Sequence, residues 1–322
     1  SSVVLSFGDN GVGRTGLGIT DGDTLIATPI DTTNLVGTTI TQVAAGDAHS
    51  LLVTADGSVF TFGFNGNGQL GLGTTTNALV ATPIDTTNLT DKTVTNVAGG
   101  ESHTLLVADG AAFSCGSNYA GQTGLGFSDG NHTLIATPID VTNLAGATVT
   151  QTSAGTKHSL LVTSDGEVYS FGDNDRGATG LGTTQDHTLV ATPIDTTHLE
   201  GKTITQVAAG ELFSLILDDD GVVYSFGTND RGQCGLGPLS GTTIARPIDT
   251  TNLEGKTITQ VAAGRFHGLI LADDGTVFSL GGYTTIATPI DSTNLVGKTI
   301  TKVAAGDRFS LLLADDGTVF SF

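Results

Sequence analysis

The sequence predicts an all-β fold assembled from one repeated unit, and three observations support this class. The apolar runs are short, rich in β-branched and aromatic side chains, and bounded by turn residues, as in β-strands. No segment has an amphipathic helical period over about eleven residues. One set of motifs recurs six times along the 322 residues, which is typical of stacked or circular repeat architectures.

The first full repeat, residues 27–73, divides into four short strands. ATPID at Ala27–Asp31 starts the outer-edge strand, where proline is tolerated because edge N–H groups have no partner. TTITQVAAG at Thr38–Gly46 ends in small residues, which suit an inner strand near a crowded axis. HSLLVT at His49–Thr54 and SVFTFG at Ser58–Gly63 supply the second and third strands. Four short strands per repeat, iterated, predict the blades of a β-propeller.

An Asp-Gly pair separates the second and third strands in every repeat. Asp-Gly between two apolar runs is a strong hairpin signal, because both central residues of a type I′ turn need a positive φ. We therefore expect type I′ hairpins at Asp56-Gly57, Asp109-Gly110, Asp165-Gly166, Asp220-Gly221, Asp274-Gly275 and Asp316-Gly317.

The glycine-rich stretch FGFNGNGQLGLG follows the third strand, at Phe62–Gly73. Other copies begin at residues 7, 115, 171 and 226, and all share four glycines, which here are Gly63, Gly68, Gly71 and Gly73. A phosphate-binding loop normally occurs once, between a strand and a helix. The repetition therefore favours a structural corner, in which the backbone turns through positive φ and packs closely against the next blade.

The spacing of the repeats predicts a single propeller domain over residues 1–322. Equivalent glycines from Gly8 to Gly281 lie 55, 53, 56, 55 and 54 residues apart, and the last repeat lacks its glycine-rich loop. We expect about six four-stranded blades, with a seven-bladed parent as the alternative. The expected repeats are residues 8–62, 63–115, 116–171, 172–226, 227–280 and 281–322.

Copies of the third strand stand at both ends of the sequence, at Val3–Phe7 and Thr318–Phe322. One of them is surplus in a six-bladed ring, so we expect closure by pairing of the N- and C-terminal strands. A surplus strand is also an exposed edge that can join a neighbouring molecule. The candidate interaction residues are Val3, Leu5, Phe7, Val319, Phe320 and Phe322.

Composition argues against several classes of partner. The formal net charge of −20, from 32 acidic and 12 basic side chains, disfavours nucleic acid and anionic membrane surfaces. No apolar run approaches the ~18 residues of a membrane helix, so we expect no membrane insertion. No secretory signal is visible and Met is absent, so we expect a processed mature form or a fragment.

Four histidines occupy one position of the repeat, after the inner-strand glycine. A ring of imidazoles near a channel would suggest a metal site. Phe213 and Phe309 hold the same position in two other repeats, which favours planar packing groups and no metal site. The four are His49, His103, His158 and His267.

The remaining reactive residues predict no chemistry. Cys115 and Cys234 replace packing groups of other repeats, so we expect buried hydrophobes rather than a disulfide. Asp-rich stretches at residues 19–24, 127–133 and 173–177 lack the ligand spacing of a calcium loop, and weak surface calcium binding stays open. The breaks in the repeat assemble no acid, base and nucleophile. We predict no enzyme activity, no catalytic residues and no cofactor.

The combined pattern VAAGxxHSLLLTxDGxVYSFGxNxxGQLGLG resembles the repeat of the regulator-of-chromosome-condensation family over practically the whole chain. The resemblance implies a β-propeller, usually seven-bladed, that serves as an interaction platform. Members include a nucleotide exchange factor for a small GTPase, a plant ultraviolet-B photoreceptor and a secreted inhibitor of β-lactamases. The chain departs from the photoreceptor by having no tryptophan, and from the exchange factor by leaving no room for its inserted wedge.

Two functions follow as expectations. The first is a non-catalytic scaffold that mediates protein–protein interaction. The second is a self-assembling extracellular structural protein, a coat or filament subunit, for which scarce lysine, abundant threonine and uniform repeats are typical. An enzyme at the channel mouth is the least favoured. We expect an extracellular or cell-surface location, and a cytoplasmic one stays open.

Overall fold

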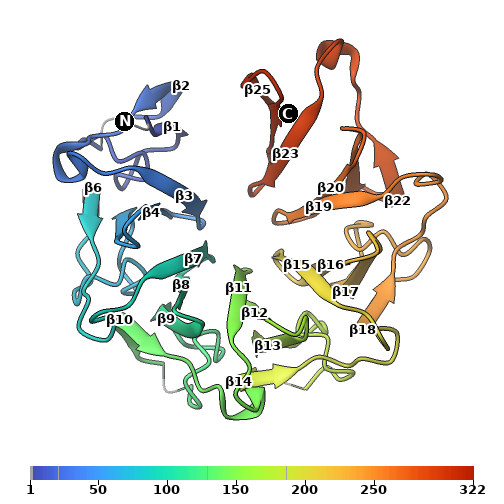
Figure 1. Ribbon diagram of the computed structural model, residues 1–322, viewed down its shortest axis with the longest axis horizontal. Coiled ribbons are helices and arrows are strands. Elements are labelled where there is room, and N and C mark those ends of the chain that lie inside the picture. Colours follow the sequence, from blue (N-terminus) through green and yellow to red (C-terminus); the bar gives the residue numbers. More distant parts are fainter. Residues whose placement is uncertain (1–2, 21, 129, 186) are drawn as a thin grey trace. The chain divides into compact units, whose positions relative to one another are not determined.

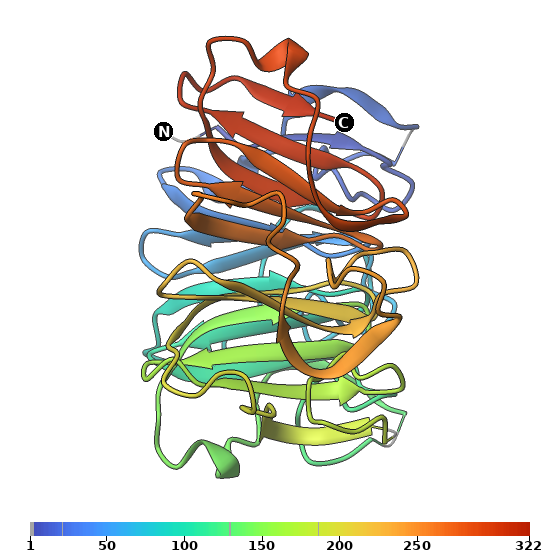
Figure 2. The ribbon, with the colours of Figure 1, turned by 90° about the vertical axis from the view of Figure 1, so that its right-hand side faces the viewer.

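The computed structural model describes residues 3–20, 22–128, 130–185 and 187–322 (Figure 1). The chain divides into two compact units: unit 1 is Ser1–Lys157 with Leu189–Ala191, and unit 2 is His158–Thr188 with Thr192–Phe322. Strands and loops make up the described ranges of both units, and their helical elements are three short 3-10 turns (Figure 2). The all-β class predicted from the sequence is confirmed.

Unit 1 contains antiparallel sheets whose strands follow chain order. The sheets are β1-β2, β3-β4-β5-β6 and β7-β8-β9-β10, and β11 follows them. The elements are β1 (Leu5–Gly8), β2 (Thr24–Pro29), η1 (Thr33–Leu35), β3 (Ile40–Ala45), β4 (His49–Thr54), β5 (Val59–Gly63), β6 (Ala78–Pro83), β7 (Val94–Gly99), β8 (His103–Ala108), β9 (Ala111–Ser117), β10 (His132–Pro138), η2 (Thr142–Leu144) and β11 (Val149–Ala154).

Unit 2 repeats this arrangement. β12 pairs with β13 and β13 with β14, and the following sheets are β15-β16-β17-β18, β19-β20-β21-β22 and β23-β24-β25. The elements are β12 (His158–Thr163), β13 (Val168–Asp173), β14 (His187–Pro193), β15 (Ile204–Ala209), β16 (Phe213–Asp218), β17 (Val223–Thr228), β18 (Gly241–Pro247), β19 (Ile258–Ala263), β20 (His267–Ala272), β21 (Val277–Gly281), β22 (Thr284–Pro289), η3 (Thr293–Leu295), β23 (Ile300–Ala305), β24 (Ser310–Ala314) and β25 (Val319–Ser321).

Each complete sheet is a four-stranded meander, which is the architecture of a propeller blade. Its first strand lies beside the first strand of the next sheet: β3, β7 and β11 are neighbours in unit 1, and β15, β19 and β23 in unit 2 (Figure 1). These six strands are the six predicted inner strands. The core lies between consecutive sheets, where Leu51 and Val53 of β4 pack with Val97 and Leu106 of the next sheet.

Proline ends the outer strand, whereas the sequence analysis placed it at the start. β6 is the edge strand of its sheet and finishes at Pro83, opposite Phe60. The residue before a proline is restricted to extended backbone, so the strand continues up to the ring. Ile84 then enters the core, and its N–H donates to the Val59 carbonyl over 3.1 Å.

The hairpins between second and third strands differ from the expected type. Type I′ geometry occurs at Asp109 and Gly110, whose φ values are 48° and 78°, with Ala108 paired directly to Ala111. At the other five Asp-Gly pairs only the glycine has a positive φ, so the type I′ prediction is wrong there.

The reason is one additional residue in the loop. The Thr54 N–H donates to the Ser58 carbonyl over 2.9 Å and encloses three residues, of which Gly57 takes the left-handed position. The Asp56 carboxylate accepts hydrogen bonds from Thr54 Oγ1 and from the Ser58 N–H. Asp56 therefore closes the turn through its side chain and keeps an ordinary backbone.

The sixth repeat closes with a two-residue turn in place of the glycine-rich loop. Gly281 pairs directly with Thr284, and the turn residues Gly282 and Tyr283 have φ values of 64° and 70°. The Tyr283 side chain is 77% exposed.

The terminal strands pair locally, which corrects the expected closure. β1 pairs with β2, with Leu5 opposite Pro29, and β25 pairs with β24, with Phe320 opposite Leu312. A pair between the two terminal strands is not among the strand pairs of residues 3–20, 22–128, 130–185 and 187–322. The physical reason is chain connectivity, because the short Asp316-Gly317 turn holds β25 against β24.

Candidate functional site

The repeated histidines lie at the start of second strands and bond to the next sheet. His49 Nε2 lies 2.9 Å from Thr104 Oγ1, and His158 Nε2 lies 2.9 Å from Ser214 Oγ. Burial lowers the pKa of His49 and of His158 to about 4, so both rings are neutral at pH 7. His267 Nε2 makes the same contact with Ser310 Oγ over 3.0 Å, and His103 is fully buried.

The type of ring at the histidine position varies together with the residue that faces it in the next repeat. His158 has the hydroxyl of Ser214 in the following repeat, whereas Phe213 has Gly268 in that register. A Cβ at Gly268 would lie 2.9 Å from Leu215 Cδ1, so a hydroxyl-bearing side chain there would require Leu215 to shift. This placement favours the interpretation that the position needs a planar side chain. The side chain packs between two sheets, and a histidine there also hydrogen-bonds to the next sheet.

We expect His49→Phe to keep the fold and to cost less than ~1.5 kcal/mol of unfolding free energy, as volume-tolerant core exchanges do. Thr104 Oγ1 donates to the Gln69 carbonyl over 2.8 Å, so its hydroxyl keeps a partner. The pKa of His49 is lowered on folding from 6.5, so its stabilisation is present above pH 6.5 and is lost as pH falls toward 4. The variant should therefore lose less stability than the parent between these values.

Urea unfolding at several pH values checks this expectation. His49→Ala, which leaves a cavity, is the control and should cost about 2–5 kcal/mol by analogy with other large-to-small core changes. Stoichiometric zinc or nickel binding that disappears in His49→Phe would contradict the packing role.

The glycine-rich loop is closed on itself and on the next sheet. Gly63, Gly68, Gly71 and Gly73 have φ values of 108°, 78°, 66° and 73°. The N–H groups of Gly68 and Gly71 donate to the carbonyls of Asn65 and Gly68, over 2.9 and 3.0 Å. The Gly73 N–H donates over 2.9 Å to the Leu134 carbonyl, on β10 of the following sheet. These donors are used within the framework, so the loop does not present them to a phosphate.

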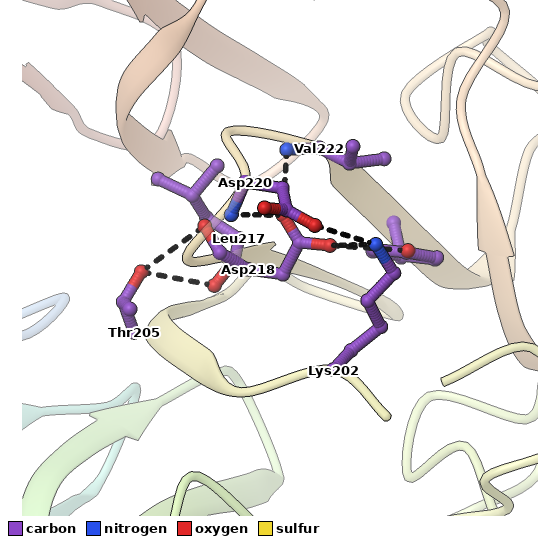
Figure 3. A network of polar contacts seen from close by, with 7 residues as sticks. Lys202, Thr205, Leu217, Asp218, Asp220 and Val222 are labelled. Carbon is purple, nitrogen blue, oxygen red and sulfur yellow. Dashed lines mark hydrogen bonds and ion pairs between the residues drawn. The ribbon is translucent and has the colours of Figure 1, made fainter. Parts of the chain in front are cut away.

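A buried carboxylate in unit 2, Asp218, is the strongest candidate for a reactive group outside the repeat pattern (Figure 3). Its oxygens accept hydrogen bonds from the N–H groups of Asp220 and Val222, over 3.1 and 2.8 Å. The Tyr224 hydroxyl donates to it over 3.2 Å, and Lys202 Nζ lies 3.5 Å away. Thr54 holds the equivalent turn in the first repeat. Asp218 therefore fixes a hairpin, and its lone pairs are occupied.

The cysteines and acidic turns give no reactive site within the described residues. Cys115 and Cys234 are free and buried, as predicted, and burial raises the pKa of each thiol to about 12. Two of the Asp-rich stretches contain Asp21 and Asp129, which lie outside the described residues. In the part of the chain that the structure describes, no three His, Cys, Asp or Glu side chains converge as a metal site.

The candidate interaction residues of the terminal strands are mostly exposed. Val3, Leu5 and Phe7 are 67, 52 and 47% exposed, and Val319 and Phe322 are 58 and 55% exposed. Phe320 instead packs against the core of its own unit. Beside β1, Val3 lines a hollow of about 430 Å³ with Ile30, Leu35 and Ile40. The alternation along β1 and β25 thus leaves apolar side chains on the surface.

The loops between first and second strands were not singled out from the sequence, although a signal existed. A dipeptide separates the glycine after each first strand from the ring at or just before the start of the second strand, and all six dipeptides differ. We name them the loop dipeptides: Asp47-Ala48, Glu101-Ser102, Thr156-Lys157, Glu211-Leu212, Arg265-Phe266 and Asp307-Arg308.

In four of these loops the first residue of the dipeptide donates a backbone hydrogen bond to the next loop, while the side chains vary. The Asp47 N–H donates over 3.2 Å to the Gly100 carbonyl, and the Glu101 N–H over 3.3 Å to the Gly155 carbonyl. In unit 2, the Arg265 N–H donates over 3.2 Å to the Gly306 carbonyl. Variable side chains on a rigid backbone are the arrangement that binding loops use on many scaffolds.

Comparison with known proteins identifies the repeat. The regulator of chromosome condensation (RCC1) repeat matches residues 2–53, 56–107, 109–162, 165–217 and 220–271. A second model of the same repeat matches residues 40–69, 149–178, 204–233 and 300–322. The chain is 32% identical over 279 residues to the ultraviolet-B receptor UVR8 of Arabidopsis thaliana, which covers 86% of this chain and 60% of the receptor.

Two solved structures share the fold. Human WBSCR16 superposes with a TM-score of 0.88 and 21% identity, covering 100% of this chain and 88% of that chain. Yeast RCC1 (Prp20), solved with Kap60 bound to it, superposes with a TM-score of 0.83 and 19% identity, covering 100% of this chain and 79% of that chain. With the six repeats, these likenesses confirm the predicted β-propeller class. Among the described residues, no helix has the length and apolarity to cross a bilayer.

Proposed function

The chain belongs to the regulator of chromosome condensation (RCC1) repeat family, and we propose that it is a non-catalytic β-propeller scaffold that binds a partner protein. Yeast RCC1 has been solved bound to Kap60, so a protein that contains this fold takes a protein partner in that case. The chain spans 60% of the plant receptor's length, so the activity of that whole receptor is not carried over.

The observation that carries the proposal is the contrast between fixed and variable positions. Glycines, histidines and turn residues that recur in the repeats form hydrogen bonds with one another or with the next sheet, as His49 does with Thr104. The loop dipeptides differ in charge and size on a hydrogen-bonded backbone. A protein partner is the ligand that side chains of such mixed charge and size suit best, because protein interfaces combine apolar, aromatic and charged side chains.

The placement of the titratable groups supports a role without catalysis. The buried reactive side chains His49, Asp218 and Cys234 each sit inside a hairpin or between sheets. A general acid or base must instead reach a substrate proton within hydrogen-bond distance. The formal charge of −20 supports a further part of the proposal, that the partner is not nucleic acid.

A displayed library of protein fragments tests the proposal. We expect enriched fragments to bind at least about tenfold more weakly to a variant in which five loop dipeptides are replaced by Asp-Ala, the pair at 47–48. The matched control carries serine at Ala55, Asp219, Asp273 and Asp315, in the turns at the other end of the second strands. Fragments that depend on the control turns, and not on the loop dipeptides, would contradict the proposal.

A second candidate is self-assembly outside the cell or at its surface, and the exposed apolar side chains of β1 favour it. In that case β1 adds to a sheet edge of another copy. Removal of residues 1–7 should then leave a folded monomer that no longer polymerises, as measured by light scattering. A full-length chain that stays monomeric at high concentration would contradict this candidate.

A further inference from the structure

An arginine cluster interrupts the acidic character of the chain in unit 2. Five of the six arginines belong to this unit, in a chain whose formal charge is −20. Arg176, Arg231 and Arg265 line one open cavity of about 110 Å³, together with Phe266. A cavity of this size accommodates one short side chain rather than a cofactor.

The Phe266 ring holds two of the guanidinium groups. Arg231 Cζ lies 4.2 Å from the ring centroid, and Arg265 Cζ lies 4.9 Å from it. Arg231 comes from the glycine-rich loop after β17, whereas Arg265 and Phe266 form the loop dipeptide between β19 and β20. Stacking on the ring fixes the guanidinium planes and leaves their N–H edges for hydrogen bonds.

The arginines differ in what neutralises them. Arg265 Nη2 lies 3.2 Å from Glu211 Oε1, and its Nη1 lies 3.5 Å from Asp307 Oδ1. Arg231 and Arg176 form no ion pair with the described residues, although Asp230 also lines the cavity. Two guanidinium groups at one cavity therefore have no carboxylate of their own.

The backbone that carries Arg231 is held on both sides. Its N–H donates over 2.8 Å to Gln233 Oε1, and its carbonyl accepts from the Tyr283 N–H over 2.9 Å. A Cβ at Gly232 would lie 1.6 Å from the Thr284 carbonyl oxygen, so the loop is in close contact with β22. A fixed loop loses little conformational freedom when a ligand binds.

Unit 1 shows that the repeat does not require this cluster. In the corresponding positions of that unit, Asn67 stands for Arg231, and Glu101-Ser102 stands for Arg265-Phe266. The same loops form there without a cation at position 67 and without an aromatic ring at position 102. The cluster is therefore a feature of one place on the surface, which folding alone does not explain.

We propose that this cluster binds an acidic peptide segment of a partner protein, with a carboxylate held by Arg231 and Arg176. A guanidinium group matches a carboxylate through two parallel hydrogen bonds, and the cavity admits a carboxylate side chain. The acidic remainder of the chain disfavours an extended polyanion such as DNA but leaves a short acidic segment room to bind locally. This inference rests on the proposed function, since it names the partner chemistry of one loop dipeptide.

Fluorescence anisotropy with a labelled peptide of alternating Glu and Ala tests the site, with its Gln counterpart as the neutral probe. We expect the acidic peptide to bind and the neutral one not to, with an affinity that falls as salt rises. Arg231→Asn, which copies Asn67 of unit 1, should weaken binding about tenfold or more. Phe266→Ser, which copies Ser102, should weaken it in the same direction.

The matched control is Arg14→Asn, which removes the same charge from a glycine-rich loop of unit 1. An equal loss of affinity in Arg14→Asn and Arg231→Asn would overturn the site, because it would show general attraction to charge. Tighter binding of inorganic phosphate or of duplex DNA at Arg231 than of the acidic peptide would overturn the ligand class. Absence of acidic-peptide binding, with library fragments still dependent on the loop dipeptides, would overturn this inference and leave the proposed function standing.

Discussion

Gly68→Val is expected to lower the free energy of unfolding by roughly 3–5 kcal/mol. Gly68 has a φ of 78°, a region that a β-branched residue essentially does not adopt. A Cβ there would also lie 2.7 Å from Leu134 Cδ2 and 3.1 Å from the Thr133 carbonyl oxygen. The free-energy costs of backbone strain and of overpacking against β10 therefore add, because a shift of the loop alone or of β10 alone does not relieve both.

Gly37→Val separates these two causes. Gly37 has nearly the same φ, 79°, but a Cβ there would meet nothing within 4 Å. This control should lose only the strain contribution, about 1–2 kcal/mol. Urea midpoints of the two variants and the parent provide the measurement. If Gly68→Val is no less stable than Gly37→Val, close packing against the next sheet is not what the loop requires.

The sequence predicts those parts of the fold that depend on local chemistry. Positive φ at Gly63 and Gly68 follows from glycine at fixed positions of every copy, and the structure has it. The inner strand QVAAG and the edge position of Pro83 also follow from residue type alone. Each of these features is decided within a few residues along the chain.

Features that depend on the register between sheets were not accessible from the sequence. The hydroxyl of Thr104 that bonds His49 lies 55 positions away, and nothing local indicates the pair. The arginine cluster is a similar case, because Arg231 and Phe266 meet only when two consecutive sheets are placed side by side. The prediction that β1 pairs with the C-terminal strand failed for another reason. The two strands are copies with equal local propensity, so chain connectivity decides which partner each one takes.

Gly100→Ala is expected to cost about 3 kcal/mol of unfolding free energy, although alanine is usually the mildest replacement for glycine. Gly100 lies after the first strand β7 and has no left-handed φ, so backbone strain does not contribute. A Cβ would lie 2.3 Å from His103 Cε1 and 2.6 Å from the Gly155 carbonyl oxygen of the neighbouring strand loop. The absent side chain is therefore what lets the ring and the next sheet approach the inner loop.

Gly11→Ala is the matched control, because Gly11 is exposed, has no left-handed φ, and its Cβ would have Asp9 Oδ1 at 3.3 Å as nearest neighbour. It should change stability by no more than about 0.5 kcal/mol, as surface substitutions do. Circular dichroism during urea unfolding compares both variants under one condition. Equal stability of Gly100→Ala and Gly11→Ala would mean that the ring at position 103 and the Gly155 carbonyl move away from the added methyl group at little cost in free energy. The spacing of the sheets would then be set elsewhere, and the loop dipeptides would stand on a backbone less rigid than its hydrogen bonds imply.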